Sequence, residues 1–158
     1  MLSAYMSSDI NNNNNSLLTN LALSGKYINS DSIKDIAKKI IIDTSSIVFG
    51  ISLKLDVFGI VAEALPDHEI AIASGTIREL ERLKTSGKKN SKDAAASIFL
   101  IQSNHILQEK SEGNVDDWIV RYAERTGAKV CTNDTELRKR LRSKGLVAVT
   151  LSQNRTLR

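Results

Sequence analysis

The chain has 158 residues, of which 41% are hydrophobic and only 4% aromatic, and its formal net charge is +4. This length and apolar content suffice for one compact domain with a core of Ile, Leu, Val and Ala side chains. No stretch approaches the roughly 18 consecutive apolar residues of a membrane-spanning helix, so we expect no membrane partner. The single cysteine, Cys131, cannot form an internal disulfide, which favours a reducing, cytoplasmic compartment and a buried, unreactive thiol.

Residues 1–30 differ in composition from the rest of the chain, because an Asn11–Asn15 run is flanked by further Ser and Asn. Such a segment cannot bury enough apolar surface to offset the entropy lost on ordering it. We therefore expect a flexible Asn-rich tail over residues 1–30 and one folded domain over residues 31–158. A short helix capped by Ser30 or Asp31 would open that domain.

Strand and helix patterns alternate along the expected domain. The expected strands are Lys39–Asp43, Glu69–Ala73, His105–Gln108, Ala128–Thr132 and Leu146–Leu151. The expected helices are Phe49–Leu65, one capped by Ser74, Ser91–Gln102, one that Asp116 opens and Gly127 ends, and one capped by Asn133. Alternation of this kind predicts a parallel sheet with helices on both faces, an α/β fold.

The segment from Asn114 to Gly145 indicates a cation site. Helical periodicity places Asp116 on the same inward face as Ile119, whereas Asp117 points nearly the opposite way. Asp134 lies just beyond the expected Ala128–Thr132 strand. Two carboxylates brought close together repel each other unless a cation or a proton lies between them.

Two more carboxylates are expected at the same edge of the sheet, because the carboxyl ends of parallel strands meet there. Asp43 follows the first strand, and Glu79 lies on the helix after the second. Alternatively, Asp43 and Asp134 are only loop or cap residues and Glu79 is ordinary helix surface. An all-oxygen ligand set without Cys or His favours Mg²⁺ or Mn²⁺ over zinc.

Basic residues concentrate near the carboxyl terminus and indicate a polyanion partner such as RNA, although a solvated helix face is the alternative. The candidate RNA-binding residues are Arg138, Lys139, Arg140, Arg142 and Lys144. A second group, Lys84, Lys88, Lys89 and Lys92, is expected to be a solvated turn that could also touch RNA. Trp118 and Tyr122, one helical turn apart, are expected in the core or at a homodimer face, with base stacking as the alternative.

Four segments, IIIDTS, IASGTIRELERL, VDDWIVRYA and VCTND, carry Asp43, Glu79, Asp116 and Asp134 in that order. In these motifs, across Lys38–Leu151, the chain resembles the PIN-domain ribonucleases. It is most similar to their archaeal ribosomal-RNA-processing type, which is related to a eukaryotic small-subunit processome endonuclease. The double Asp of VDDWIV, the block TNDTELRKRLR and the basic end carry this finer likeness.

The resemblance implies a three-layer α/β/α sandwich with a parallel sheet of about five strands, formed by a PIN-like nuclease domain over residues 31–158. It also implies that the four acids hold divalent metal and that single-stranded RNA is cleaved to 5′-phosphate and 3′-hydroxyl ends. Asp117 and Thr132 match positions that often accompany the acids. Ser45 stands where the family usually has Asn, which predicts less firmly held metal ligands and low turnover.

We therefore expect an endoribonuclease, dependent on Mg²⁺ or Mn²⁺, that cleaves structured precursor RNA, with ribosomal RNA as the first interpretation. One alternative is a toxin of the VapBC kind that cleaves tRNA or rRNA, which would be encoded beside a small antitoxin gene. The other is a catalytically weak RNA-binding factor in ribosome assembly. Metal-dependent cleavage of a labelled RNA separates this last alternative from the two nucleases.

Overall fold

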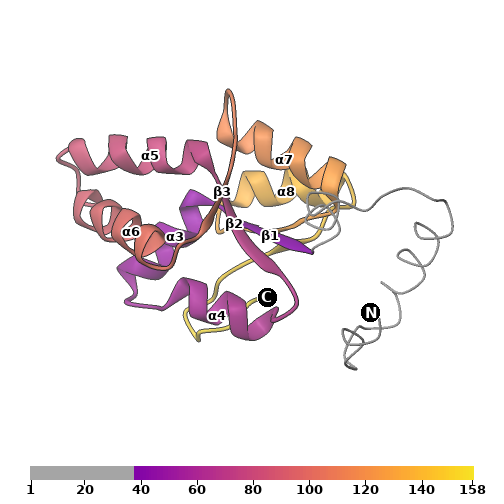
Figure 1. Ribbon diagram of the computed structural model, residues 1–158, viewed down its shortest axis with the longest axis horizontal. Helices are drawn as coiled ribbons and strands as arrows, with labels where there is room; N and C mark the ends of the chain where they lie inside the picture. Colours follow the sequence, from indigo (N-terminus) through magenta and orange to yellow (C-terminus); the bar gives the residue numbers. More distant parts are fainter. Residues whose placement is uncertain (1–37) are drawn as a thin grey trace, which may run out of the picture. The chain divides into compact units, whose positions relative to one another are not determined.

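The computed structural model describes residues 38–158; the predicted tail over residues 1–30 and the predicted cap at Ser30 or Asp31 lie outside the described residues. The strands are β1 (Lys39–Ile42), β2 (Glu69–Ala73), β3 (Leu107–Glu109), β4 (Lys129–Cys131) and β5 (Ala148–Val149). The helices are α3 (Thr44–Ser52), α4 (Val57–Ala64), α5 (Ser74–Thr85), α6 (Ser91–Ser103), α7 (Val115–Thr126) and α8 (Thr135–Ser143). Figure 1 shows their arrangement.

The strands form one parallel sheet in the order β3-β2-β1-β4-β5. From β1 the chain first builds β2 and β3 on one side, and then crosses over to build β4 and β5 on the other. The strand order therefore reverses between β1 and β4, and in parallel sheets ligand sites lie at the carboxyl ends of the strands at such a point. The backbone N–H of Asp43 extends this pairing by donating to the carbonyl of Cys131 at 2.9 Å.

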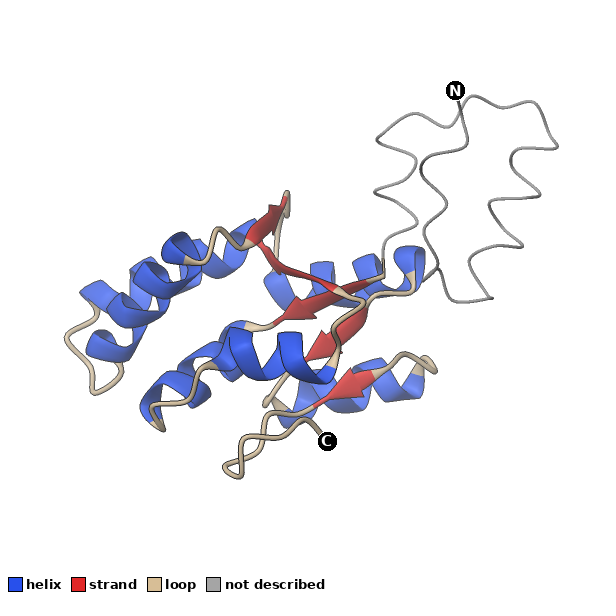
Figure 2. Cartoon of the chain, turned by 60° about the horizontal axis from the view of Figure 1, so that its bottom comes forward, coloured by secondary structure: helices blue, strands red, loops and turns tan. Residues whose placement is uncertain are grey.

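Alternating isoleucines in β1 divide the core between the two faces of the sheet. Ile40 and Ile42 pack with residues of α3 to α6, whereas Ile41 packs with α7 and α8, and all three side chains are 0% exposed. Helices therefore lie on both sides of the strands, as Figure 2 shows. The predicted three-layer α/β/α sandwich around a five-stranded parallel sheet is confirmed.

Most expected elements are present with small shifts in their bounds. The third strand begins two residues later than expected, at Leu107, because His105 leaves helix α6 with a left-handed φ of 50°. Gly127 ends α7 with a φ of 73°, as predicted. Cys131 is fully buried, and burial raises the pKa of its thiol to about 11, so it is an unreactive core side chain.

The prediction of a single helix over Phe49–Leu65 is wrong. Helix α3 begins directly after β1, and it is separated from α4 by a break at which the two helix axes turn by 114°. Lys54 has a left-handed φ of 55° at this break, and the side chain of Asp56 caps α4 by accepting the N–H of Gly59 at 3.0 Å. No single helix in residues 38–158 is long and apolar enough to cross a membrane; only the bent pair of α3 and α4 meets that standard jointly.

Two predicted caps are also wrong. Ser74 is the first residue of α5 rather than its cap, and its hydroxyl lies 3.2 Å from the hydroxyl of Ser111. Asp134, not Asn133, caps α8, since its Oδ1 accepts the N–H of Leu137 at 2.8 Å. Adjacent Asn133 and Asp134 are both preferred cap residues, so the sequence pattern does not distinguish them.

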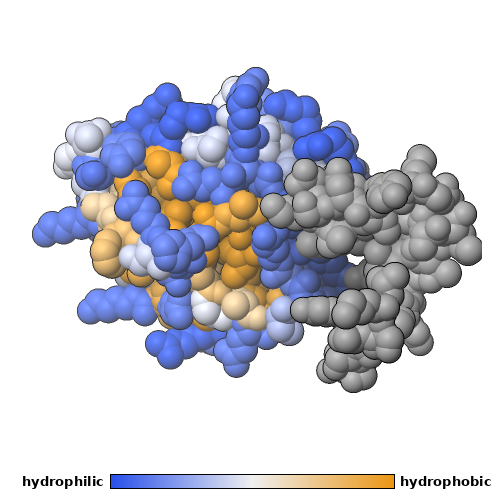
Figure 3. Space-filling model, viewed as in Figure 1, coloured by the Kyte–Doolittle hydropathy of each residue, from blue (hydrophilic) through white to orange (hydrophobic). Residues whose placement is uncertain are grey.

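Apolar side chains reach the surface on one face of the described domain. Figure 3 shows apolar side chains gathered in the middle of the face in view, within a rim of hydrophilic ones. Among the described residues, the large hydrophobic side chains that remain exposed are Leu53, Phe99, Leu107 and Val147.

Candidate active site

Asp43 lies at the carboxyl end of β1 and caps α3. Its side chain is 4% exposed, and its Oδ2 accepts hydrogen bonds from Ser45 Oγ at 2.5 Å and from Thr132 Oγ1 at 2.9 Å. Burial raises the pKa of Asp43, and the hydrogen bonds from Ser45 and Thr132 oppose that rise. The hydroxyl donors therefore hold a carboxylate that has been largely removed from water.

Ser45 joins the turn after β1 to the loop after β4. Its hydroxyl oxygen accepts the backbone N–H groups of Asn133 and Asp134, each at 3.1 Å, and lies 3.2 Å from Thr132 Oγ1. Although serine is shorter than the asparagine expected here, its hydroxyl contacts both acid-bearing loops. The effect of Ser45 on turnover stays a prediction.

Asn133 links three separate segments, a role that the sequence did not indicate. Its Oδ1 accepts Ser46 Oγ at 2.8 Å and the N–H of Leu151 at 3.2 Å, while its Nδ2 donates to the carbonyl of Leu151 at 2.9 Å. The side chain thus ties the segment after β5 to the loops that carry Asp43 and Asp134. No local pattern predicts this, because the partners lie in distant parts of the chain.

Glu79 faces the neighbouring helix rather than open solvent. Thr44 Oγ1 donates to Glu79 Oε2 at 2.6 Å, which joins the first residue of α3 to the middle of α5. Glu81, on the other edge of the same helix, is exposed and pairs with Lys84 at 3.4 Å. The two glutamates therefore differ in their surroundings, while the role of Glu79 in a metal site stays a prediction.

Asp116 is half-buried in the first turn of α7, where it interacts with the other three acids. Burial raises its pKa, and the negative charges of Asp43, Asp134 and Glu79 raise it further, while Arg140 opposes them. Carboxylates must be near one another to exert such an effect. Contacts through Thr44 and Ser45 join the segments that carry Glu79, Asp43 and Asp134 at the carboxyl ends of the strands, the rim of the sheet, and the charges of these three acids act on Asp116.

Asp117 pairs with a cation of the neighbouring helix α8, and its orientation away from the rim stays a prediction. It forms an ion pair with Arg140 on α8 at 2.5 Å, and the two side chains are 49% and 45% exposed. Its backbone N–H donates to Asn114 Oδ1 at 3.0 Å, which caps α7. Asp117 therefore connects α7 to α8 on the surface.

The four acids are close but do not form a closed ligand shell. Within residues 38–158, no group of three His, Cys, Asp or Glu side chains is arranged to hold a metal ion as it stands. Instead, three of the carboxylates accept hydrogen bonds from the protein itself. Glu79 accepts one from Thr44, Asp43 accepts one from Ser45, and Asp134 accepts one from the N–H of Leu137. Their all-oxygen chemistry and mutual repulsion nevertheless fit a hard divalent cation.

The predicted RNA-binding residues lie on α8 or just after it, and most of them have partners. Three contact acids, namely Lys139 with Glu136, Arg140 with Asp117 and Lys144 with Glu124; Arg138 donates to Thr150, and Arg142 is exposed. The ion pairs are all solvent-exposed, where each contributes at most about 1 kcal/mol. The role of these residues in RNA binding stays a prediction.

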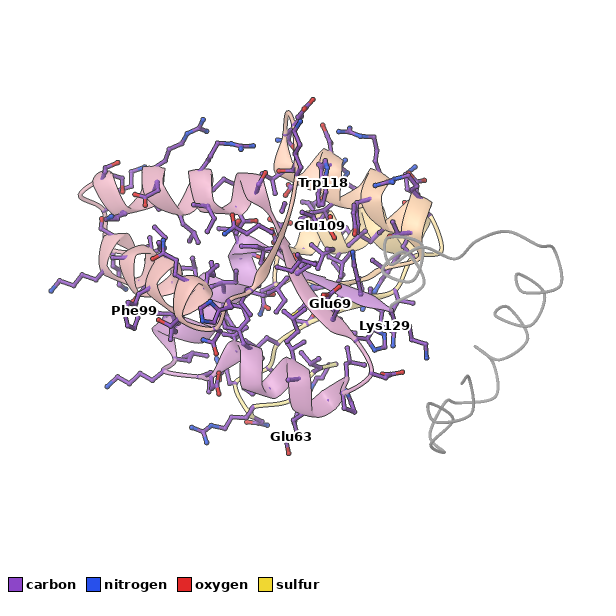
Figure 4. All side chains as sticks on the ribbon, in the orientation of Figure 1. Glu63, Glu69, Phe99, Glu109, Trp118 and Lys129 are labelled. Atoms are coloured by element: carbon purple, nitrogen blue, oxygen red, sulfur yellow. The ribbon has the colours of Figure 1, made fainter. Side chains whose placement is uncertain are left out.

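The aromatic pair on α7 belongs mainly to the core. Tyr122 is 5% exposed, and its ring stacks on that of Trp118 with centroids 4.6 Å apart. Its hydroxyl donates to Glu109 Oε1 at 3.0 Å, and Lys39 Nζ lies 2.5 Å from the same oxygen. Figure 4 labels Trp118 and Glu109 at this junction. This buried polar network ties α7 to β1 and β3, and sequence periodicity did not predict it.

The α/β/α sandwich, with four acids at the rim where its strand order reverses, defines the class of fold and site. The chain belongs to the PIN like domain family, which matches residues 40–154. It is similar to ribonuclease VapC9 of Archaeoglobus fulgidus, with 29% identity over 67% of this chain and 77% of that protein.

Solved structures give the same fold. The PIN domain endonuclease Utp24 has a TM-score of 0.64 at 23% identity and covers 77% of this chain and 90% of its own. A domain of a functionally unknown protein from Methanocaldococcus jannaschii has a TM-score of 0.54 at 22% identity, covering 73% and 92%. VapBC2 from Rickettsia felis, solved with a DNA fragment from its promoter, has a TM-score of 0.53 at 18% identity, covering 71% and 98%.

Proposed function

We propose that this protein is a divalent-metal-dependent endoribonuclease that cleaves precursor RNA, with ribosomal RNA as the preferred substrate. The observation that carries the proposal is the set of contacts that join the acid-bearing segments: Thr44 donates to Glu79, and the Ser45 hydroxyl contacts both Asp43 and the N–H of Asp134. The pKa of Asp116, raised by burial and by the charges of these three acids, agrees with it. A protein has little reason to hold four carboxylates together unless a ligand compensates for their repulsion. Membership of the PIN like domain family supports nuclease chemistry.

Asp43, Glu79, Asp116 and Asp134 would hold the cation, and their hard oxygen ligands suit Mg²⁺ or Mn²⁺. When bound, such a cation lowers the pKa of a coordinated water and offsets charge on the scissile phosphate. Ser45 and Thr132 both donate to Oδ2 of Asp43, which leaves Oδ1 as the atom to reach a ligand. To bind the cation, the side chain of Glu79 would exchange its hydrogen bond with Thr44 for a contact with the metal.

Helix ends at the rim would help to bind the phosphate of RNA. Helices α3, α7 and α8 each begin beside one of the acids, at Asp43, Asp116 and Asp134. The N-terminus of a helix carries partial positive charge and free N–H groups, which attract anions. Flanking phosphates would then lie along the cations on and just after α8, from Arg138 to Lys144.

Two other functions have specific support. The likeness to ribonuclease VapC9 favours a toxin of the VapBC kind, and an antitoxin gene beside this one would support it. The open arrangement of the acids favours a catalytically weak RNA-binding factor in ribosome assembly. The ribosomal interpretation among the nucleases is supported by the sequence motifs, namely the double Asp of VDDWIV and the block TNDTELRKRLR.

Cleavage of a 5′-labelled RNA, with Mn²⁺ and with a chelator, tests the proposal. Glu79→Gln should lower the metal-dependent rate by more than about 100-fold while the RNA affinity stays within a few-fold. Glu81→Gln is the matched control, because Glu81 is exposed on the same helix, and it should cleave like the parent. RNA binding without metal-dependent cleavage by the parent would support the assembly factor and reject the nuclease. Sequencing of RNAs crosslinked to the protein in cells then identifies the substrate.

A further inference from the structure

A cluster of hydrogen bonds fastens the start of α5 to the loop that precedes α7. The N–H of Gly75 donates to Ser111 Oγ at 2.7 Å, and the N–H of Ser111 donates to Ser74 Oγ at 2.9 Å. The guanidinium of Arg78 donates to the carbonyl of Ser111 at 3.1 Å. We refer to Ser74, Gly75, Arg78 and Ser111 as the Ser111 clasp. All polar groups of Ser111 take part in it, and the residue is only 5% exposed.

The packing around the clasp leaves no space between the two helices. A Cβ atom at Gly75 would lie 2.5 Å from Val115 Cγ2, on the first residue of α7, and 3.0 Å from Ser111 Oγ. Real Cβ atoms essentially never approach within 3.0 Å of another heavy atom, so any other residue at position 75 would force Val115 or its surroundings to shift. Glycine therefore permits the close approach, and Ser111 holds it.

The clasp lies where it can control the separation of two acids. Glu79 follows Ser74 on α5, and Asp116 follows Ser111 across the turn into α7, each five residues later. In the part of the chain that the structure describes, no hydrogen bond joins Glu79 to Asp116, although the charge of Glu79 contributes to the raised pKa of Asp116. Gly75 in the clasp meets Val115, the residue before Asp116, so the clasp holds the start of α5 against the start of α7 and thereby affects how far apart these carboxylates lie.

Arg78 strengthens this interpretation. It is adjacent to Glu79 in the chain, yet its guanidinium contacts the carbonyl of Ser111, and among the described residues it forms no ion pair. A guanidinium on the rim would neutralise carboxylates that a metal needs. The backbone carbonyl of Ser111 thus gives the Arg78 guanidinium a partner within the clasp.

We propose that Ser111 is a positioning residue, which sets the separation of Glu79 and Asp116 and thereby the affinity of the rim for a divalent cation. This inference rests on the proposed function, since it assumes that the acids bind metal. Groups that orient metal ligands without touching the metal typically change metal affinity by 10- to 100-fold when removed. A merely structural serine would change stability and leave affinity unaltered.

Binding of Mn²⁺ to the full-length protein, followed by the paramagnetic resonance signal of free Mn²⁺ well below the melting temperature, tests the proposal without any turnover. Ser111→Ala should weaken Mn²⁺ binding by about tenfold. The matched control is Ser97→Ala on α6, where a serine that is 0% exposed donates only to the carbonyl of Asp93 in its own helix. Ser97→Ala should lower the melting temperature and leave Mn²⁺ affinity within about twofold of the parent.

If Ser111→Ala binds Mn²⁺ as tightly as the parent, Ser111 is structural and the inference is overturned, while the proposed function stands. If the parent itself fails to bind Mn²⁺, both are overturned. If Ser111→Ala does not fold, Ser74→Ala takes its place, because Ser74 is only half-buried. The Mn²⁺ affinity of Ser74→Ala should be several-fold weaker than that of the parent. Where both variants fold, the double variant should lose less than the product of the two single losses, because both residues act through one clasp.

Discussion

Thr132 Oγ1 donates a 2.9 Å hydrogen bond to Asp43 Oδ2, although the two residues are 89 positions apart in the chain. Thr132 is 0% exposed and Asp43 is 4% exposed, so water cannot replace the hydrogen bond when either side chain is removed. The bond crosses from β1 to β4, the two strands between which the strand order reverses. The site and the middle of the sheet are therefore stabilised by the same contact.

Thr132→Val keeps the shape of the side chain and removes this donor. We expect the free energy of unfolding at neutral pH to fall by about 1–3 kcal/mol, since a buried carboxylate loses a hydrogen bond. The loss should be smaller at a pH at which Asp43 is protonated, because the bond to a neutral acid is weaker. Denaturant melts of parent and variant at both pH values measure this. Equal losses at the two pH values would contradict it.

Thr76→Val should have the opposite effect. Thr76 is also 0% exposed, but its Oγ1 is the one buried side-chain oxygen or nitrogen in residues 38–158 without a hydrogen-bond partner. Replacing an unpaired buried hydroxyl by a methyl group removes a desolvation cost, so stability should stay unchanged or rise by up to about 1 kcal/mol. The same denaturant melts measure it, and a loss near that of Thr132→Val would show that Thr76 has an unseen partner.

The contacts of these buried polar side chains could not be predicted from the sequence. Hydrophobic runs and their terminal acids are local, so Lys39–Ile42 and the position of Asp43 could be predicted. The contacts that Thr132, Ser111 and Asn133 make with other elements could not, because those partners lie 18 or more positions away and polar side chains carry no periodic signal. Periodicity predicts which face of an element is buried, but it does not identify the polar partners between loops.

The break between α3 and α4 could not be predicted for a related reason. Apolar residues continue at helical spacing through Leu53 and Val57, so the pattern favours one helix. The tertiary structure overrides this pattern by burying Leu55 in the core, with 7% exposure, while Lys54 adopts a left-handed φ. The local signals for two helices were Asp43 and Asp56, which cap them, since Asp is a preferred cap.

The cations of α8 give the next prediction. Replacing Arg138, Lys139 and Arg142 together by Ala should weaken binding to all RNA sequences alike. It should also flatten the slope of log affinity against log salt by about 0.7 for each phosphate of a single strand that the variant no longer neutralises. Lys88, Lys89 and Lys92, which are exposed at the turn between α5 and α6, provide a matched triple variant. RNA affinities of both triple variants, measured at several salt concentrations, show which of the two basic surfaces binds RNA. An unchanged slope for the α8 variant would show that the cations of α8 are only solvated.

Asp116→Asn tests the four-acid rim through stability. The pKa of Asp116 is raised in the folded state by burial and by the charges of Asp43, Asp134 and Glu79. The folded protein therefore holds more protons than the unfolded chain at pH values between the unfolded pKa, about 3.9, and the higher folded value. Stability falls as pH rises through that window, so at pH 7 the full penalty is present and below the window it is absent. Asp116→Asn should accordingly stabilise the metal-free protein by about 1 kcal/mol at pH 7 and by much less near pH 3.

Manganese and a matched variant complete this test. Mn²⁺ should stabilise the parent by mass action, because the assembled rim exists only in the folded state, and it should stabilise Asp116→Asn much less. Asp117→Asn removes the same charge one position away, where the side chain pairs with Arg140 on the surface. It should cost less than about 1 kcal/mol and keep the parent's Mn²⁺ shift. Thermal melts of the three proteins with chelator and with excess Mn²⁺ give the result. If Asp116→Asn instead destabilises the metal-free protein and keeps the full Mn²⁺ shift, Asp116 only begins α7 and the four-acid site is wrong.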